Sequence, residues 1–227
     1  HSVERMFRRN VVIRYEGRVH NRLVGFRNAR IFPIRLIHHG YDPAEGSAQK
    51  KFERTSALLK RDLEDDPENP LTWHYLSCSY LSVGLLRESL EASRKAIDLS
   101  ESRRDPNPVF FWSRYNAALC LYRQQDLDGA EAMAMSALRL CKRHIDSHFI
   151  LTLIHYERGD WARLIHHGTE YVRLVRLLRI DPGEFGTMPT CSLNDEWNLH
   201  VLIGIAHHEL GEDSPCRDAL ERAARTA

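Results

Sequence analysis

Histidine is the residue of this sequence with the widest range of possible chemistry, because imidazole can ligate a metal or carry a proton near neutral pH. The chain contains 13 histidines, and six of them form the adjacent pairs His38-His39, His166-His167 and His207-His208. Adjacent side chains on a helix point about 100° apart, so a single pair cannot chelate a metal. We predict that these are surface or groove histidines. The alternative is a zinc or nickel site at which the three pairs converge.

The five cysteines are the second candidate set, because thiolates bind metals and form disulfides. Their number is odd, their spacing is wide and no C-x-x-C motif occurs; the positions are Cys78, Cys120, Cys141, Cys191 and Cys216. This pattern argues against a disulfide framework and against a zinc ribbon. We predict small, mostly buried helix residues and a reducing, cytoplasmic compartment. We expect no metal site.

Composition and charge describe an ordinary globular chain of 227 residues with a net charge of +1. No apolar stretch approaches the roughly 18 residues that span a membrane, so we predict no membrane span. Residues 1–42 hold nine arginines against three acidic residues. These arginines alternate with apolar residues, as on the solvent-facing side of a sheet. We therefore do not predict nucleic acid binding.

An internal repeat covers most of the chain. Residues 73–80 (W-H-Y-L-S-C-S-Y) match the first-helix pattern of the tetratricopeptide (TPR) repeat, with serine at its small position. Gly84 follows at the turn, and Ser89 and Ala96 stand at the small positions of the second helix. Small residues let two antiparallel helices cross closely. The pattern predicts a helical hairpin.

Three further units follow, and the turns at residues 125 and 159 are 34 residues apart, which is one TPR period. The longer spacings predict insertions at 102–108 and 181–194. Residues 48–65 resemble a single return helix, and in the last unit Ser214 is the expected N-cap before Pro215. We therefore predict a mainly α-helical, TPR-type solenoid of about nine helices over residues 43–227.

The first 42 residues have a different pattern. The runs 3–7, 11–15 and 31–37 are short and rich in β-formers, and Arg9-Asn10, Gly17 and Gly25 separate them. We predict two to four short strands. So few residues cannot enclose a core of their own. The segment must therefore pack on the solenoid or belong to a larger domain.

Four motifs in these residues occur in a recognisable order. They are R-M-F-R-R-N at 5–10, Y-E-G-R-V-H at 15–20, H-H-G-Y at 38–41, and Lys51 followed by Arg54. This succession resembles the end of the catalytic domain in bacterial family-2 glycosyltransferases that carry C-terminal TPR repeats. Asn21 and Thr55 depart from the family, which has Glu and Asn at these positions. The departure at Asn21 leaves that position without an acid.

The resemblance implies that residues 1–42 are the last strands of an incomplete glycosyltransferase-like domain. The intact enzyme would use a nucleotide sugar and a divalent metal, Mg or Mn, held by a D-x-D carboxylate pair. His20 would lie near the diphosphate or the metal. Neither the carboxylate pair nor the catalytic base is expected in this chain, which lacks cofactors of its own. Its partner would be its own missing catalytic domain.

One D-x-D sequence does occur, at Asp126-Leu127-Asp128. It lies at the turn of the second hairpin, where an aspartate commonly caps the next helix. We predict a helix cap there and no metal role.

Alignment of the repeats predicts a concave groove lined by the first helix of each hairpin. The expected groove residues, which hold a protein or peptide, are His74, Trp112, Tyr115, Asn116, Tyr122, Arg123, Phe149, Tyr156, Glu157 and His208. Aromatic rings with polar rims suit such contacts. The alternative is that many of these side chains pack between neighbouring helices. The lysines of a chaperone-type carboxylate clamp are missing from these positions.

Two functions from different classes follow. The first is a TPR partner-binding module from the C-terminal end of a nucleotide-sugar-dependent glycosyltransferase, which alone has no sugar-nucleotide site and no activity. The second is a free-standing TPR adaptor for protein–protein interaction.

Overall fold

A computed structural model describes residues 12–19, 22–25, 47–104, 110–185 and 190–226 of the chain. Within these ranges it contains nine α-helices, two short strands and two 3-10 helices. The elements are β1 (Arg14–Glu16), β2 (Arg22–Val24), α1 (Ser47–Asp65), α2 (Pro70–Leu81), α3 (Leu86–Ser102), α4 (Phe110–Arg123), α5 (Leu127–Leu140), α6 (Ile145–Glu157), α7 (Trp161–Ile180), η2 (Pro182–Phe185), η3 (Leu193–Asp195), α8 (Glu196–Glu209) and α9 (Asp213–Thr226).

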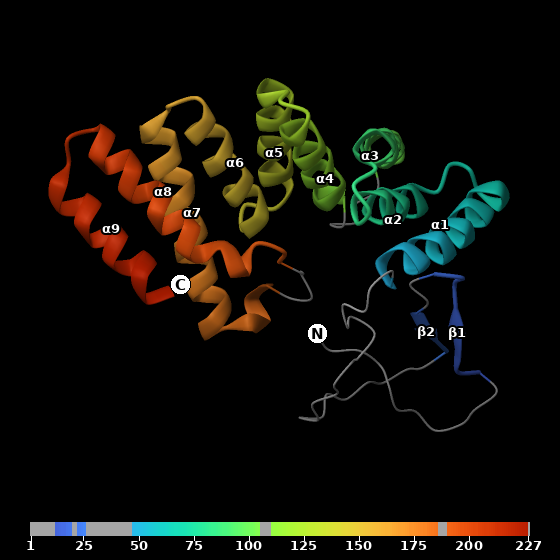
Figure 1. The fold of residues 1–227 in the computed structure, drawn as a ribbon. Helices are drawn as coiled ribbons and strands as arrows, with labels where there is room; N and C mark the ends of the chain where they lie inside the picture. The colour runs from blue at the N-terminus through green and yellow to red at the C-terminus, as the bar shows by residue number, and fades with distance from the viewer. Residues whose placement is uncertain (1–11, 20–21, 26–46, 105–109, 186–189, 227) are drawn as a thin grey trace.

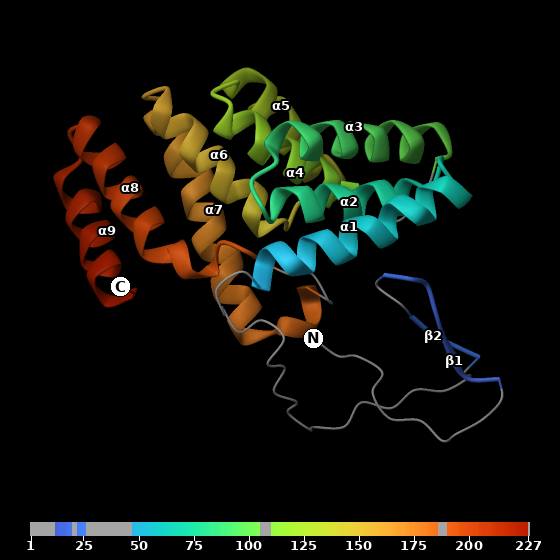
Figure 2. The same cartoon turned by 45° about the vertical axis from the view of Figure 1, so that its right-hand side comes forward.

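The helices form four consecutive hairpins, α2–α3, α4–α5, α6–α7 and α8–α9, with α1 packed on α2 as a single leading helix. The first helix of each later hairpin also packs on the second helix of the hairpin before it. Figure 1 shows the hairpins side by side in an arc, and Figure 2 shows α1 running along α2. The predicted helical-hairpin solenoid is confirmed.

The hairpin turns lie where the repeat pattern predicted them. Gly84, Gly159 and Gly211 have positive φ angles of 77°, 66° and 74°, a conformation that glycine adopts without a steric cost. The second hairpin has Gln125 at the same place with φ of 64°. A residue with a side chain at a positive φ angle lowers the stability of the fold by about 1 kcal/mol.

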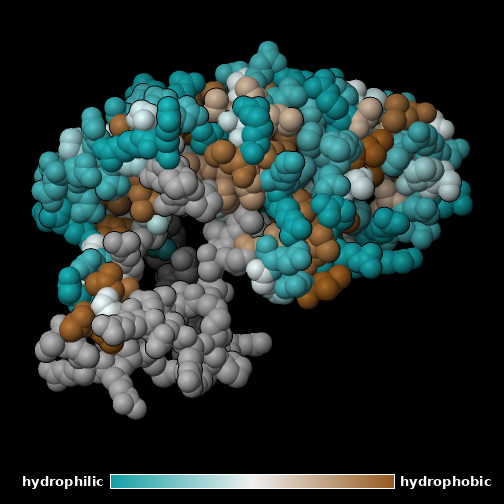
Figure 3. All heavy atoms as spheres, turned by 180° about the vertical axis from the view of Figure 1, so that it is seen from behind, coloured by the Kyte–Doolittle hydropathy of each residue, from teal (hydrophilic) through white to brown (hydrophobic). Residues whose placement is uncertain are grey.

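Small side chains allow the helices to cross closely. Ser77 of α2 and Ser89 of α3 are both fully buried, and the Ser89 hydroxyl donates to the Ser77 carbonyl oxygen at 2.9 Å. The second hairpin uses Ala118 and Ala130 at the same places. The predicted small positions therefore form the hairpin interfaces. The face opposite to the view of Figure 1 is mostly hydrophilic, with scattered hydrophobic patches (Figure 3).

The crossing of α7 and α8 depends on Gly168. A Cβ atom at this position would lie 2.9 Å from Cγ1 of Ile203, too close for carbon atoms. We expect Gly168→Val to lower the free energy of unfolding by about 2 kcal/mol through overpacking, measured by urea denaturation. Ala162→Val, on the exposed side of the same helix, is the matched control for β-branching. Equal stability of the two variants would contradict this role of Gly168.

Two helix ends differ from the prediction. Helix α9 begins at Asp213, because its first helical hydrogen bond runs from the Cys216 N–H to the Glu212 carbonyl oxygen. Ser214 and Pro215 therefore lie inside the first turn, and the predicted Ser214 cap is wrong. Helix α7 continues to Ile180, whereas the repeat pattern predicts that the return helix that begins at Trp161 ends at Val175, five residues earlier.

The described N-terminal residues form an antiparallel hairpin in which Tyr15 of β1 pairs with Leu23 of β2. After β1, Nη1 of Arg18 lies 2.7 Å from Oδ1 of Asp62 and 2.6 Å from Oδ2 of Asp65, both on α1. The hairpin is therefore tied to the solenoid by charge. The expected strands at 3–7 and 31–37, and the expected domain boundary after residue 42, lie outside the described residues.

Candidate functional site

Three of the predicted groove residues lie in the interior. His74, Tyr115 and Asn116 are 4%, 6% and 3% exposed. Nδ1 of His74 lies 2.9 Å from the Ser113 hydroxyl oxygen. The Asn116 amide donates to the Ser77 hydroxyl oxygen at 3.0 Å. His74 and Asn116 therefore join α2 to α4, and the burial of all three side chains leaves them little surface for contact with a partner.

Two aromatic residues of the predicted groove are half-buried. Trp112 meets the rings of Tyr115 and His144 edge-on, at centroid distances of 5.8 Å and 4.8 Å. Phe149 lies 5.8 Å from the ring of Tyr171. Each ring thus packs against its neighbours and keeps part of its surface accessible.

The other five predicted residues keep accessible side chains at the C-terminal ends of α4, α6 and α8. We call them the end row: Tyr122, Arg123, Tyr156, Glu157 and His208.

Two contacts order the end row. The Tyr122 hydroxyl donates to Oε1 of Glu157 at 3.5 Å, which connects α4 to α6. The ring of Tyr156 meets that of Trp161 edge-on at 6.2 Å and is 38% exposed. Tyr122 and Tyr156 are 34 residues apart, one repeat, so successive hairpins present an aromatic ring at the same place. Such a row can contact an extended chain with rings, a cation and a carboxylate.

The insertion between α7 and α8 is anchored by Asp146, in the first turn of α6. Its buried carboxylate accepts hydrogen bonds from the Cys191 and Ser192 N–H groups at 3.0 Å each. The Ser192 hydroxyl donates to it at 2.6 Å. The Tyr171 hydroxyl donates to the Ser192 carbonyl oxygen at 2.5 Å. Sequence reasoning missed Asp146; its only signal was an acidic residue in the first turn of α6, which begins I-D-S-H-F.

The pKa values of Tyr115 and Cys191 connect this insertion with α2 and α4. Burial raises the pKa of Tyr115 well above its ordinary value, and the charges of Asp146 and Cys191 add to the effect. Burial likewise raises the pKa of the Cys191 thiol, and Asp146 and then Cys78 of α2 act in the same direction. Cys191 is therefore close enough to Tyr115 of α4 and Cys78 of α2 for their charges to influence one another.

The D-x-D sequence has a structural role. Oδ1 of Asp126 accepts a hydrogen bond from the Gly129 N–H at 2.9 Å, which caps α5 as predicted. The Asp128 carboxylate is paired with Arg158 of the next hairpin. Neither carboxylate is turned toward a shared ligand.

The two histidine pairs within the described residues lie on different helices, His166-His167 on α7 and His207-His208 on α8. His166 and His208 are exposed, while His167 is 7% exposed, so the prediction of a surface or groove position is wrong for His167. Its neighbours are His148, whose Nδ1 lies 3.1 Å from Nδ1 of His167, and His155, which stacks on it at 5.5 Å. In the described part of the chain, no three His, Cys, Asp or Glu side chains are arranged to hold a metal. His38, His39 and His20 lie outside the described residues.

Comparison with known structures gives the fold. MamA has a TM-score of 0.61 at 17% identity, covering 85% of this chain and 96% of MamA. BtubC from P. vanneervenii has 0.63 at 16%, covering 80% of this chain and 74% of that one. YrrB, described as a TPR protein with an unusual peptide-binding site, has 0.57 at 14%, covering 80% of each chain. This chain has a TPR-type fold.

Sequence comparison adds one similarity. No family model matches. The SPbeta prophage-derived glycosyltransferase SunS of Bacillus subtilis is 27% identical over 109 residues, which cover 43% of this chain and 26% of SunS. The chain thus spans about a quarter of the length of this relative. Among the described helices, none is long and apolar enough to cross a membrane.

Proposed function

We propose that this TPR-type chain is a partner-binding module that holds a protein or peptide segment against the end row. The observation that carries the proposal is the repeated Tyr122/Tyr156 position, which stays accessible while the deeper groove positions His74, Tyr115 and Asn116 are buried. The peptide-binding site in the description of YrrB supports a peptide as the occupant. Arg123 and Glu157 supply charges of both signs beside the rings.

We further propose that the module belongs to the C-terminal end of a nucleotide-sugar-dependent glycosyltransferase. The similarity to SunS and the order of the four N-terminal motifs support this origin. Residues 1–42 would then end the catalytic domain, with His20 near the diphosphate. The nucleotide sugar and a divalent metal, Mg or Mn, would be held by the rest of that domain, because Asp126 and Asp128 are engaged in structural contacts. The five free cysteines favour a reducing, cytoplasmic compartment.

The alternative is a free-standing TPR adaptor whose N-terminal strands only cap the solenoid. The contact of Arg18 with Asp62 and Asp65 favours it, since it shows that the strands have a place on α1. Sequencing the reading frame upstream of His1 separates the two functions. Alternating strands and helices with a strand-end D-x-D upstream would establish the glycosyltransferase. A start codon directly before His1 would leave the adaptor.

The end row is tested with peptides selected from a random phage-displayed library on the purified chain, with binding then measured by fluorescence polarisation. We expect Tyr156→Ala and Arg123→Glu each to weaken the selected peptide about tenfold, because a ring or a charge at the contact is lost. Lys95→Ala, on the exposed side of α3, is the control and should bind as the unmodified chain does. Equal affinity of all three variants would remove the end row as the binding surface.

A further inference from the structure

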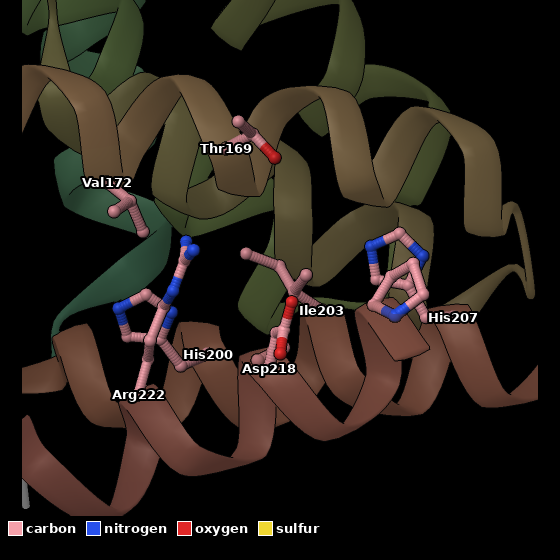
Figure 4. A pocket seen from close by; sticks show the side chains of 9 residues that line it. Thr169, Val172, His200, Ile203, His207, Asp218 and Arg222 are labelled. Carbon is pink, nitrogen blue, oxygen red and sulfur yellow. The ribbon is translucent and has the colours of Figure 1, made fainter. Parts of the chain in front are cut away.

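A pocket of about 180 Å³ lies between α7 and α9, with α8 as its floor. The residues that matter for its chemistry are Thr169 and Val172 of α7, His200 and Ile203 of α8, and Asp218 and Arg222 of α9 (Figure 4). His200 and Ile203 face the pocket, whereas His208 of the end row leaves α8 on another side. The pocket is therefore separate from the end row.

His200 is a buried polar side chain without a polar partner in the described structure. It is 5% exposed, and neither ring nitrogen has a hydrogen bond to another described residue. Its ring nitrogens are not sealed from solvent, so they can meet a ligand atom in the pocket. Burial lowers the pKa of His200; the charge of Glu196 opposes this effect, and the charge of Arg222 adds to it. The neutral ring has one N–H to donate.

Asp218 and Arg222 supply the two charges of the pocket. They are four residues apart on α9, a spacing at which Asp and Arg commonly form an ion pair. Among the described residues neither takes part in a salt bridge; both are exposed residues of α9 that line the pocket. In Figure 4 the Arg222 guanidinium lies beside His200 and Val172, and the Asp218 carboxylate lies beside Ile203. The pocket therefore has a positive end and a negative side, and α8 contributes Ile203, His200 and His207 to its floor.

We propose that this pocket binds a small zwitterion of the α-amino acid class. The ligand carboxylate takes hydrogen bonds from the Arg222 guanidinium, the His200 N–H and the Thr169 hydroxyl. The ligand ammonium group pairs with the Asp218 carboxylate. An aliphatic ligand side chain covers Ile203 and Val172. Arginine suits the first role, since its planar donors match a carboxylate.

The size of the pocket agrees with this class of ligand. A volume of about 180 Å³ equals that of about six water molecules in the liquid, at roughly 30 Å³ each. Pockets for drug-sized molecules usually measure about 300–1,000 Å³. A small molecule such as an amino acid suits a pocket of this volume. The proposal is independent of what the end row binds.

The test is a titration of the ¹⁵N-labelled chain with L-leucine, followed by NMR. We expect saturable shifts of the Thr169, Ile203 and Ala219 amides. Two matched ligands lack one charge each: 4-methylpentanoate has no ammonium group and 3-methylbutylamine has no carboxylate. We expect each of them, and the variants Arg222→Gln and Asp218→Asn with leucine, to bind about tenfold more weakly.

Arg225→Gln is the control on the same helix, because Arg225 pairs with Glu221 and does not line the pocket. This variant should bind leucine as the unmodified chain does. Shifts that fail to saturate at the solubility limit of leucine would overturn the proposal. Equal affinity for leucine and 4-methylpentanoate would also overturn it, since the site would then be an anion site in which Asp218 has no part.

Discussion

Acidification from about pH 7 to about pH 5 is expected to lower the free energy of unfolding of this chain by about 4 kcal/mol. The loss comes from His144 and His167, whose pKa values are lowered by burial from 6.5 to about 3. In the unfolded chain both side chains take up a proton near pH 6.5. In the folded chain they stay neutral down to about pH 3.

The sign follows from proton uptake. Between about pH 6.5 and pH 3 the unfolded state binds more protons than the folded state, so folding becomes less favourable as the pH falls. Each pH unit in this window costs about 1.4 kcal/mol per histidine. The burial of His148 and His155 lowers their pKa values too and acts in the same direction. Above about pH 7 the contribution of these histidines to stability is constant.

The local structure explains why these rings stay neutral. His144 is enclosed by the rings of Phe111, Trp112 and Tyr115, and its Nε2 has no hydrogen-bond partner in the described structure. His167 lies against His148, His155 and His166. A protonated His167 would also be repelled by any of these rings that carries a proton of its own. Arg163 adds a further positive charge on α7. A charge at either site would be buried without a counter-ion.

Urea denaturation followed by circular dichroism at several pH values measures this effect. His167→Gln removes one titrating group, and its loss of stability between pH 7 and pH 5 should be smaller than that of the unmodified chain by about 2 kcal/mol. His208→Gln, at an exposed position, should leave the pH dependence unchanged. A stability that is flat over this range would show that the two imidazoles are not held neutral by the fold.

Asp146→Ala is expected to lower the free energy of unfolding by about 3 kcal/mol and to release the insertion between α7 and α8. The carboxylate is the acceptor for two backbone N–H groups and one hydroxyl of Cys191 and Ser192. Hydrogen bonds to a charged group contribute about 1.5–3 kcal/mol each, and the donors left behind are partly buried. Asp146→Asn keeps one acceptor oxygen and should lose less.

Hydrogen exchange detects the release directly. In the Asp146→Ala chain, the amides of Cys191 and Ser192 should exchange with solvent much faster, while amides in the middle of α4 keep their protection. Asp98→Ala, an exposed position on α3, is the matched control and should change neither stability nor exchange. Retained protection at Cys191 and Ser192 would mean that another contact, such as that from Tyr171 to Ser192, holds the insertion in place.

Release of the insertion also bears on the groove. The pKa effects connect Cys191 with Tyr115 and Cys78, so this segment lies near the inner helices that were expected to hold a partner. If a selected peptide binds only to the end row, Asp146→Ala should leave its affinity unchanged. If the affinity rises, the insertion competes with the peptide for the same face.

The repeat architecture could be predicted from the order of residues alone. The small residues Ser77, Ser89 and Ala96, with Gly84 at the turn, specify a helical hairpin through contacts between residues that are close in the sequence. Such local patterns recur with the TPR period of 34 residues. The same local chemistry identified Asp126 as a cap. Helix ends were less certain, as Ser214 shows, because several polar residues in a row offer alternative caps.

The burial of individual side chains, and the contacts between residues distant in the sequence, depend on how the hairpins pack and could not be predicted. A repeat pattern places His74, Tyr115 and Tyr156 on the same side of their helices. It does not say that the first two are enclosed by the next hairpin. Asp146 meets Ser192, which is 46 residues away, through an insertion whose path no periodicity describes. The pocket beside His200 likewise exists because α7 and α9 do not meet above α8, a matter of packing between helices that lie far apart in the chain.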